Sequence, residues 1–515
     1  MPRLVLQSVF GGDAFAEVGE PTGIYSSPDG RYLAVAGTVD DYAWSRGGYG
    51  PATTLLHRVV VYDTGNLDPI ADTNAGRYRI NDVAWHATEP IVAIGAGEYD
   101  GGFYFKGDLI LWDLDNQRSA RPFSLDGYPF GRQVVSCAFE RDGSLSIQAM
   151  PVGGTASLTY YRVRSLSIPE STWRRFEDRV IPPFDHFDET EIARTGWEVV
   201  EELWPSTVPI MSELGAIAKG HGRSYEPRWM AWDVAWAPDG RVLAVRNGTA
   251  LEGWRRDGTL EFRVPHRSDG TRVTVSPGGN RAYCCVWSRN PDDDFRENPN
   301  KYAAVLEIDL ESAEAREVAT DPTDTAPWGY RRLRMEGAPA AYYERASSEP
   351  RGNRLIPKSG WVATGDPTTA EVRDLFSLEW DEARDGNLSA DASVYIDDDS
   401  GPALIIACHV ISPPPTHERY LEINRRQVPS GECIWSERVD DPVVALAHLA
   451  GTGLVAFSLR DGGLGLLSAA DGRTVSEEPA SIDGIPTGIL SLASREDEIA
   501  AGTIDGRVAI YRLEL

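Results

Sequence analysis

One pattern recurs along this chain and limits its fold more than any other feature: an alternating apolar run, a tight turn and a second apolar run. The clearest copy is residues 233–236, the turn Pro238-Asp239-Gly240, and then residues 242–245. Alternation with a period of two turns one face of a strand inward, and a Pro-Asp-Gly turn reverses the chain. Each copy therefore predicts an antiparallel hairpin, and the chain is predicted to be all-β.

Copies of the pattern are spread over the whole chain, centred near residues 25, 85, 139, 236, 275, 396, 448 and 492. Five of the seven intervals lie close to the ~40–45 residues of one blade in a β-propeller. The two longer intervals contain insertions. The spacing predicts a propeller of seven to eight four-stranded blades, with eight favoured; seven results if the copy near 139 or the one near 390–440 is not a blade.

The repeated Pro-Asp-Gly turns and the strand end Leu111-Trp112-Asp113 resemble the WD40-type β-propeller family. The resemblance implies a single closed β-propeller domain over residues 1–515. The repeats are degenerate, because the chain has one Gly-His pair, Gly220-His221, and one strand end with Trp-Asp.

The last copy, from residue 490 to residue 515, has room for three strands. The apolar run at residues 3–10 precedes the first copy and belongs to no blade of its own. We expect it to supply the outer strand of the last blade, since this pairing removes an exposed edge.

Two segments interrupt the pattern. Residues 165–228 are predicted to be a helical insertion, with helices over 170–176 and 188–204, the second limited by Pro205, Pro209 and Gly215. This insertion could pack on the flank of the propeller or serve as a docking arm. Residues 321–390 are predicted to be an irregular insertion.

Aromatic residues gather in two long loops that link the second and third strands of a blade. The candidates for partner binding are Tyr42, Trp44, Tyr49, Tyr99, Phe103, Tyr104 and Phe105. Aromatic side chains in exposed loops are typical anchors of protein interfaces. The alternative is that they fold down onto the rim of the propeller.

The sequence contains no recognised catalytic motif, and no two of its eight histidines stand at metal-ligand spacing. We therefore predict no catalytic, cofactor-binding or metal residues, no cofactor, and a non-catalytic protein-interaction scaffold or adaptor. Two alternatives stay open: a metal-assisted propeller hydrolase of the lactonase or phosphoesterase kind, and a sensor that binds a sugar or a peptide.

The composition limits the partners. Asp and Glu number 78 and Lys and Arg number 50, so the net charge is −28, and a nucleic-acid partner is not expected. No run approaches 18 apolar residues and the start of the chain lacks a secretory pattern, so we expect a monomeric, cytoplasmic protein without a membrane partner. The acidic surface favours protein partners with a basic surface.

Overall fold

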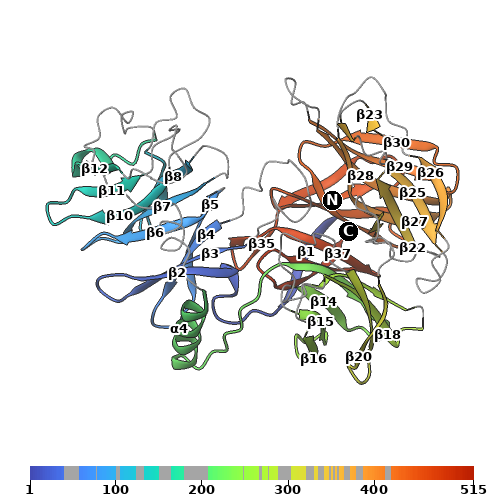
Figure 1. Cartoon of the computed structure of the whole chain (residues 1–515), viewed down its shortest axis with the longest axis horizontal. Coiled ribbons are helices and arrows are strands. Elements are labelled where there is room, and N and C mark those ends of the chain that lie inside the picture. Colours follow the sequence, from blue (N-terminus) through green and yellow to red (C-terminus); the bar gives the residue numbers. More distant parts are fainter. Residues whose placement is uncertain are drawn as a thin grey trace. The chain divides into compact units, whose positions relative to one another are not determined.

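The computed structural model is an all-β chain with few helices (Figure 1). It describes residues 1–39, 57–76, 78–99, 105–122, 133–149, 164–178, 207–246, 249–265, 270–276, 278–287, 303–320, 330–333, 341–346, 350–351, 354–355, 359–364, 372–377, 387–411 and 419–515.

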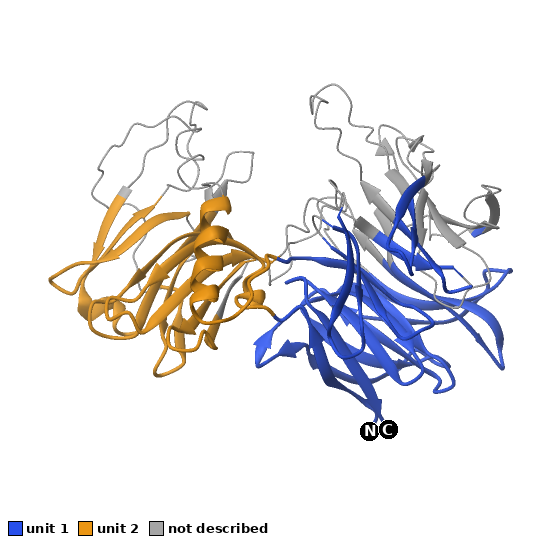
Figure 2. Ribbon diagram, turned by 90° about the horizontal axis from the view of Figure 1, so that it is seen from below, with its two compact units in different colours: residues 1–12, 228–515 blue, residues 13–227 orange. Residues whose placement is uncertain are grey.

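The chain divides into two compact units, coloured separately in Figure 2. Unit 1 consists of residues 1–12 and 228–515, and unit 2 consists of residues 13–227. Unit 2 is therefore inserted, in sequence, between the first strand of unit 1 and the rest of it.

The described part of unit 1 contains six four-stranded antiparallel sheets. The first three are β13 (Ala231–Trp236), β14 (Val242–Arg246), β15 (Thr249–Trp254) and β16 (Leu260–Pro265); β17 (Gly270–Val275), β18 (Arg281–Trp287), β19 (Ala303–Asp309) and β20 (Ala315–Thr320); and β21 (Tyr330–Leu333), β22 (Ala341–Ala346), β25 (Ser359–Thr364) and β26 (Val372–Ser377). The next two are β27 (Asn387–Asp398), β28 (Gly401–Ile411), β29 (Arg419–Gln427) and β30 (Cys433–Arg438); and β31 (Val443–Leu449), β32 (Leu454–Leu459), β33 (Gly463–Ser468) and β34 (Thr474–Pro479).

The sixth sheet joins the two ends of the sequence. It contains β37 (Ile489–Arg495), β38 (Glu498–Thr503) and β39 (Val508–Glu514), and β1 (Arg3–Phe10) pairs antiparallel with β39 from Arg3 opposite Glu514 to Phe10 opposite Val508. The strand expected at residues 3–10 is thus present in the expected place. It covers the edge of β39, which would otherwise offer unpaired backbone groups.

The sheets of unit 1 follow one another in a row. The sheet of β13–β16 contacts the sheet of β17–β20 on one side and the sheet of β37–β39 on the other, and the row continues through the sheets of β31–β34 and β27–β30 to that of β21–β26. The two sheets at the ends of the row, β17–β20 and β21–β26, are consecutive in the sequence.

Hydrogen bonds from the first strand of a sheet fix its neighbours. Trp236 of β13 donates its indole Nε1–H to the carbonyl oxygen of Ala493 in β37 at 3.1 Å, and Asp233 accepts the backbone N–H of Val273 in β17 at 2.9 Å. These partners are buried, so each bond replaces hydration that the groups lose on folding.

Unit 2 contains two four-stranded sheets and one three-stranded sheet among its described residues. Their strands are β2 (Glu20–Ser26), β3 (Tyr32–Thr38), β4 (His57–Asp63) and β5 (Pro69–Gly76); β6 (Ile80–Trp85), β7 (Ile91–Tyr99), β8 (Phe105–Asp113) and β9 (Arg118–Ala120); and β10 (Val134–Phe139), β11 (Leu145–Ala149) and β12 (Arg164–Ile168). The same bonds recur here: Trp85 donates to the carbonyl of Tyr25 at 3.0 Å, and Asp82 accepts the N–H of Cys137 at 2.9 Å.

The helical insertion differs from its prediction. Helix α2 (Glu170–Trp173) falls within the predicted 170–176, whereas the predicted 188–204 lies outside the described residues. Helix α4 (Thr207–Gly220) contains Pro209 and Gly215, which were expected to end a helix. Pro209 is tolerated because it is the third residue of α4, where the backbone N–H has no partner within the helix.

The predicted irregular insertion at 321–390 contains regular structure. Its described residues form the sheet of β21, β22, β25 and β26, the short strands β23 (Pro350–Arg351) and β24 (Arg354–Leu355), and the start of β27. This sheet was not predicted because its strands are interrupted and show little of the apolar–polar alternation by which a strand is recognised in a sequence.

Candidate functional site

The aromatic residues predicted to bind a partner lie mostly beyond the described structure. Tyr42, Trp44, Tyr49, Phe103 and Tyr104 are outside the described residues. Tyr99 and Phe105 are the last residue of β7 and the first residue of β8, and they pair directly in the sheet. These two residues therefore belong to strands rather than to the long loop in which they were expected, and a role in partner binding stays a prediction for all seven residues.

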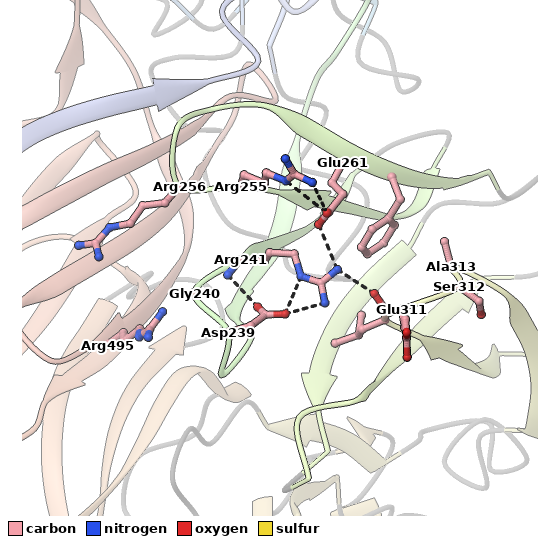
Figure 3. A pocket seen from close by; sticks show the side chains of 12 residues that line it. Asp239, Gly240, Arg241, Arg255, Arg256, Glu261, Glu311, Ser312, Ala313 and Arg495 are labelled. Carbon is pink, nitrogen blue, oxygen red and sulfur yellow. Dashed lines mark hydrogen bonds and ion pairs between the residues drawn. The ribbon is translucent and has the colours of Figure 1, made fainter.

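A pocket of about 770 Å³ lies within unit 1, at the ends of four hairpins (Figure 3). It is lined from the β13–β14 turn, the β15–β16 turn, the β19–β20 turn and the C-terminal end of β37. The side chains that give it its character are the arginines and acids Asp239, Arg241, Arg255, Arg256, Glu261, Glu311 and Arg495.

Acidic residues shape the turns that carry these side chains. Asp239 accepts the backbone N–H of Arg241 at 3.0 Å, and Asp257 accepts that of Thr259 at 2.9 Å. Gly240 follows Asp239 with φ +92°, a conformation that side-chain-bearing residues rarely adopt. The Pro-Asp-Gly signal that predicts the hairpin is thus also what brings Arg241 to the pocket.

Arg241 is held at the centre of the pocket. Its Nε donates to Asp239 Oδ2 at 2.8 Å, and its Nη1 donates to Glu261 Oε2 at 3.2 Å and to the carbonyl of Leu310 at 2.7 Å. Its guanidinium also lies over the ring of Phe262, 5.6 Å from the centroid. Only 17% of its side chain is exposed. Arg241 is therefore held in one position by its bonds to three turns.

The carboxylates around Arg241 are ionised at neutral pH. Burial opposes the charge of Asp239, but the hydrogen bonds and the charge of Arg241 outweigh it and leave the pKa of Asp239 below its usual value. The pKa of Glu261 is also lowered, chiefly by the hydrogen bonds from Arg255. The pocket therefore contains fully charged groups of both signs.

Three further arginines stand around this centre with donors to spare. Arg255 gives Nε and Nη2 to Glu261, at 3.2 and 2.8 Å, and 58% of its side chain is exposed. Arg256 gives Nη2 to Glu498 and is 60% exposed.

Arg495 differs from the other arginines of the pocket. Its guanidinium lies over the ring of Trp236, 5.7 Å from the centroid, and its Nη2 is 3.5 Å from the carbonyl oxygen of Pro238. No carboxylate of the described residues lies within 4.0 Å of it. Its charge is therefore the least compensated in the pocket, and the Trp236 ring holds it in place.

This site was missed from the sequence because each arginine alone is ordinary for a surface turn. The pocket also lies at the end of the strands that carries the first-to-second and third-to-fourth turns, whereas the conspicuous aromatic residues are in second-to-third loops. One repeated pattern in the sequence could have indicated the site. An arginine lies within two residues of an acidic turn residue at Arg241, at Arg255 and Arg256, and at Arg495.

Chemically, the pocket offers guanidinium donors suited to an anion. Among the residues that the structure describes, no group of three or more His, Cys, Asp and Glu side chains could hold a metal ion. Within the same residues, no helix has the length and apolar character needed to cross a membrane.

Comparison with known proteins gives similarity of structure. No family model matches the sequence, and no curated protein matches it. Similar solved structures include the WD40 repeats of RRP9 (11% identity, TM-score 0.35) and U3-55K (11%, 0.34), each covering 56% of this chain and 96% of the other. Virginiamycin B lyase from Staphylococcus aureus is also similar (13%, TM-score 0.33), covering 55% of this chain and 94% of the lyase. Most sheets of the described residues are four-stranded and antiparallel.

Proposed function

We propose that this protein is a non-catalytic interaction scaffold, and that the arginine-lined pocket of unit 1 receives an acidic group of a partner protein. The observation that carries the proposal is the lining of the pocket, in which four arginines outnumber three acids and Arg495 stacks on Trp236 with no carboxylate of the described residues within 4.0 Å. Fixed turns are suited to recognition because little side-chain and loop ordering remains to be done on binding.

The net charge and the pocket favour different features of the same partner. A net charge of −28 attracts a protein with a basic surface at long range. The pocket then selects, at short range, an acidic group on that protein. We infer that the protein acts as a cytoplasmic monomer, so that the partner belongs to another chain.

We also infer that unit 1 closes on itself as a six-bladed propeller. The row of six sheets supports this, because the sheets at its two ends follow one another in the sequence and β1 completes the sheet of β37–β39. This assigns residues 13–227 to a separate body and replaces the expected ring of eight.

The test of the scaffold function is quantitative affinity capture from lysate of the native cell, followed by metal analysis of the purified protein. The variant Arg255→Ser, Arg256→Ser, Arg495→Ser should lose the principal captured protein at least tenfold. The control variant Arg3→Ser, Arg175→Ser, Arg316→Ser makes the same charge change at exposed sites outside the pocket and should retain it. Equal capture by both variants, or a stoichiometric divalent metal with hydrolytic activity, would contradict the proposal.

A further inference from the structure

We propose that Asp483 and Gly484 form a site of spontaneous covalent modification, at which the backbone of unit 1 rearranges through a cyclic imide to isoaspartate. The site is separate from the arginine-lined pocket, and the proposal does not depend on the proposed function. It is drawn from one Asp-Gly turn whose bonding differs from that of seven other turns with the same two residues.

The dipeptide Asp-Gly occurs twelve times in the sequence, and the structure describes both residues of eight copies. Glycine has no side chain to shield its backbone nitrogen from a neighbouring carboxyl group. Every copy therefore has the chemistry for the rearrangement, and the local structure decides which copy reacts. The eight copies begin at Asp29, Asp142, Asp239, Asp257, Asp461, Asp471, Asp483 and Asp505.

The reaction needs a carboxyl group and a backbone nitrogen that are free to meet. The nitrogen of Gly484 attacks Cγ of the protonated Asp483 carboxyl group, an N–Cγ bond forms, and the carboxyl hydroxyl leaves with the amide proton as water. Water then opens the five-membered imide. Cleavage of the N–Cγ bond restores aspartate, whereas cleavage of the bond from nitrogen to the backbone carbonyl carbon gives isoaspartate, in which the chain runs through Cβ and Cγ.

In seven of the eight described copies, both reacting groups are engaged. The glycine N–H donates to a backbone carbonyl three or four residues earlier, at 2.8 to 3.1 Å. The aspartate carboxylate accepts the backbone N–H two residues further along, at 2.9 to 3.3 Å. Because these bonds must break before the nitrogen reaches Cγ, the seven turns resist the reaction.

The turn at Asp483 has a different geometry. Ile482 and Ile485 pair directly across the hairpin of β35 (Ser481–Ile482) and β36 (Ile485–Pro486), which leaves Asp483 and Gly484 as a two-residue loop with φ of 54° and 80°. Both angles are positive, as in a type I′ hairpin turn. Among the described residues, the Gly484 N–H donates to no backbone carbonyl, and the Asp483 carboxylate makes no hydrogen bond or ion pair.

The two residues are also accessible and easily moved. Both are exposed, and a Cβ added to Gly484 would meet nothing within 4 Å. The hairpin has only two residue pairs, and a two-stranded ribbon this short contributes little stability by itself. A positive φ is also unfavourable for a residue with a side chain, so opening the turn relieves strain at Asp483.

The product would disturb the core beneath the hairpin. Isoaspartate adds one atom to the backbone between Ile482 and Ile485, which are 0% and 5% exposed. Ile482 packs in one cluster with Leu466 of β33 and Leu492 of β37, so it contacts a core shared by two sheets. A two-residue loop cannot take an extra backbone atom and keep this pairing, and the modification should therefore loosen the junction of these sheets.

The experiment ages the full chain in its native state and compares two of its tryptic peptides. Residues 474–495 form one peptide in which Asp483 is the only aspartate, and residues 229–241 form another, which contains Asp239-Gly240. Electron-transfer fragmentation distinguishes isoaspartate from aspartate. We expect isoaspartate to accumulate in 474–495 at least tenfold faster than in 229–241, together with an imide form one water lighter.

Ageing in urea provides the control for sequence, because it removes the hydrogen bonds of every turn. The two peptides should then form isoaspartate at rates within threefold of one another. Equal rates in the native chain would overturn the proposal. A tenfold difference that persists in urea would also overturn it, since the local sequence rather than the fold would then select the site.

Two variants test the chemistry at the turn. Asp483→Glu should abolish the modification, because its imide would need a six-membered ring, which forms far more slowly. Asp483→Asn reaches the same imide by loss of ammonia and should give isoaspartate faster than wild type. Absence of isoaspartate from native Asp483→Asn would mean that the turn keeps the two groups apart, and the proposal would fail.

Discussion

The indole nitrogen of Trp236 lies 3.1 Å from the carbonyl oxygen of Ala493, although 257 positions separate the two residues. This bond joins β13 to β37 and sets which sheets are neighbours in unit 1. Trp85 makes the corresponding bond to Tyr25 in unit 2 at 3.0 Å. Both tryptophans end the same four-residue sequence, Asp-Val-Ala-Trp, at residues 82–85 and 233–236.

Trp236→Phe should weaken unit 1 selectively. The change keeps an aromatic ring and removes the donor, which leaves the buried Ala493 carbonyl without that partner at a cost of about 1–3 kcal/mol. Hydrogen exchange followed by mass spectrometry should show faster exchange in β37 and β13. Trp85→Phe should move the effect to unit 2, and a uniform effect of both variants would contradict this account.

Phe10→Ala should reveal how much β1 contributes to unit 1. Phe10 is 2% exposed and stacks on Trp254 with ring centroids 6.1 Å apart, so its truncation should cost about 3–5 kcal/mol in urea unfolding. Arg3→Ser, on the same strand, breaks an exposed 2.9 Å ion pair with Glu514 and should cost less than about 1 kcal/mol. Similar costs for the two variants would mean that β1 is not docked as described.

The stability of unit 2 should fall with acid because of His57. Burial, and secondarily the charge of Arg79, lowers the pKa of His57 to about 3, well below that of an unfolded histidine. Below about pH 6.5, His57 therefore binds a proton in the unfolded chain but not in the folded chain. The stability present above about pH 6.5 is lost as the pH falls toward 3.

The expected slope is about 1.4 kcal/mol per pH unit between pH 6 and pH 5, where few carboxylates titrate. Urea unfolding of His57→Gln should show a flatter dependence than wild type over that window. The comparison is made at matched pH values, since the substitution also alters the contact of Nδ1 with Thr38 Oγ1 at 3.0 Å. Parallel curves for the two proteins would rule out His57 as the source.

Removing residues 13–227 should leave unit 1 able to fold. Gly11 and Arg228 contact one another, with the Arg228 Nη1 donating to the Gly11 carbonyl at 3.4 Å, so a linker of a few glycines can join the ends. We expect a soluble protein that unfolds cooperatively and still captures the principal partner protein. An aggregated product would contradict the proposal that unit 1 closes on its own as a ring of six sheets.

The sequence is informative where a local signal fixes a local structure. The hairpin around Pro238-Asp239-Gly240 and the pairing of residues 3–10 with the last strand follow from alternation and turn chemistry, and both are present. The order of the sheets does not follow, because it depends on contacts such as Trp236 with Ala493 that no local pattern encodes. Helix α4 was missed because Pro209 is a breaker inside a helix but is tolerated in the first turn.

The pocket shows the same limit. Arg241 next to a turn aspartate indicates a surface ion pair, and nothing local tells that Arg255 and Arg495 approach the same space. Their meeting depends on the contact between β13 and β37, which is a property of the whole unit. The aromatic loops, by contrast, were conspicuous in the sequence, and five of their seven candidate residues lie outside the described structure.

The two ends of unit 2 lie close together, and this has a consequence for how the unit can evolve. The chain enters beside the place where it leaves: Ala14 donates its N–H to the Ser224 carbonyl at 2.9 Å, just beyond the contact of Gly11 with Arg228. A segment whose two ends lie this close together can be gained, lost or exchanged by a single recombination event without disturbing the unit into which it is inserted. The sequences of the two units can therefore diverge at different rates, each under its own selection.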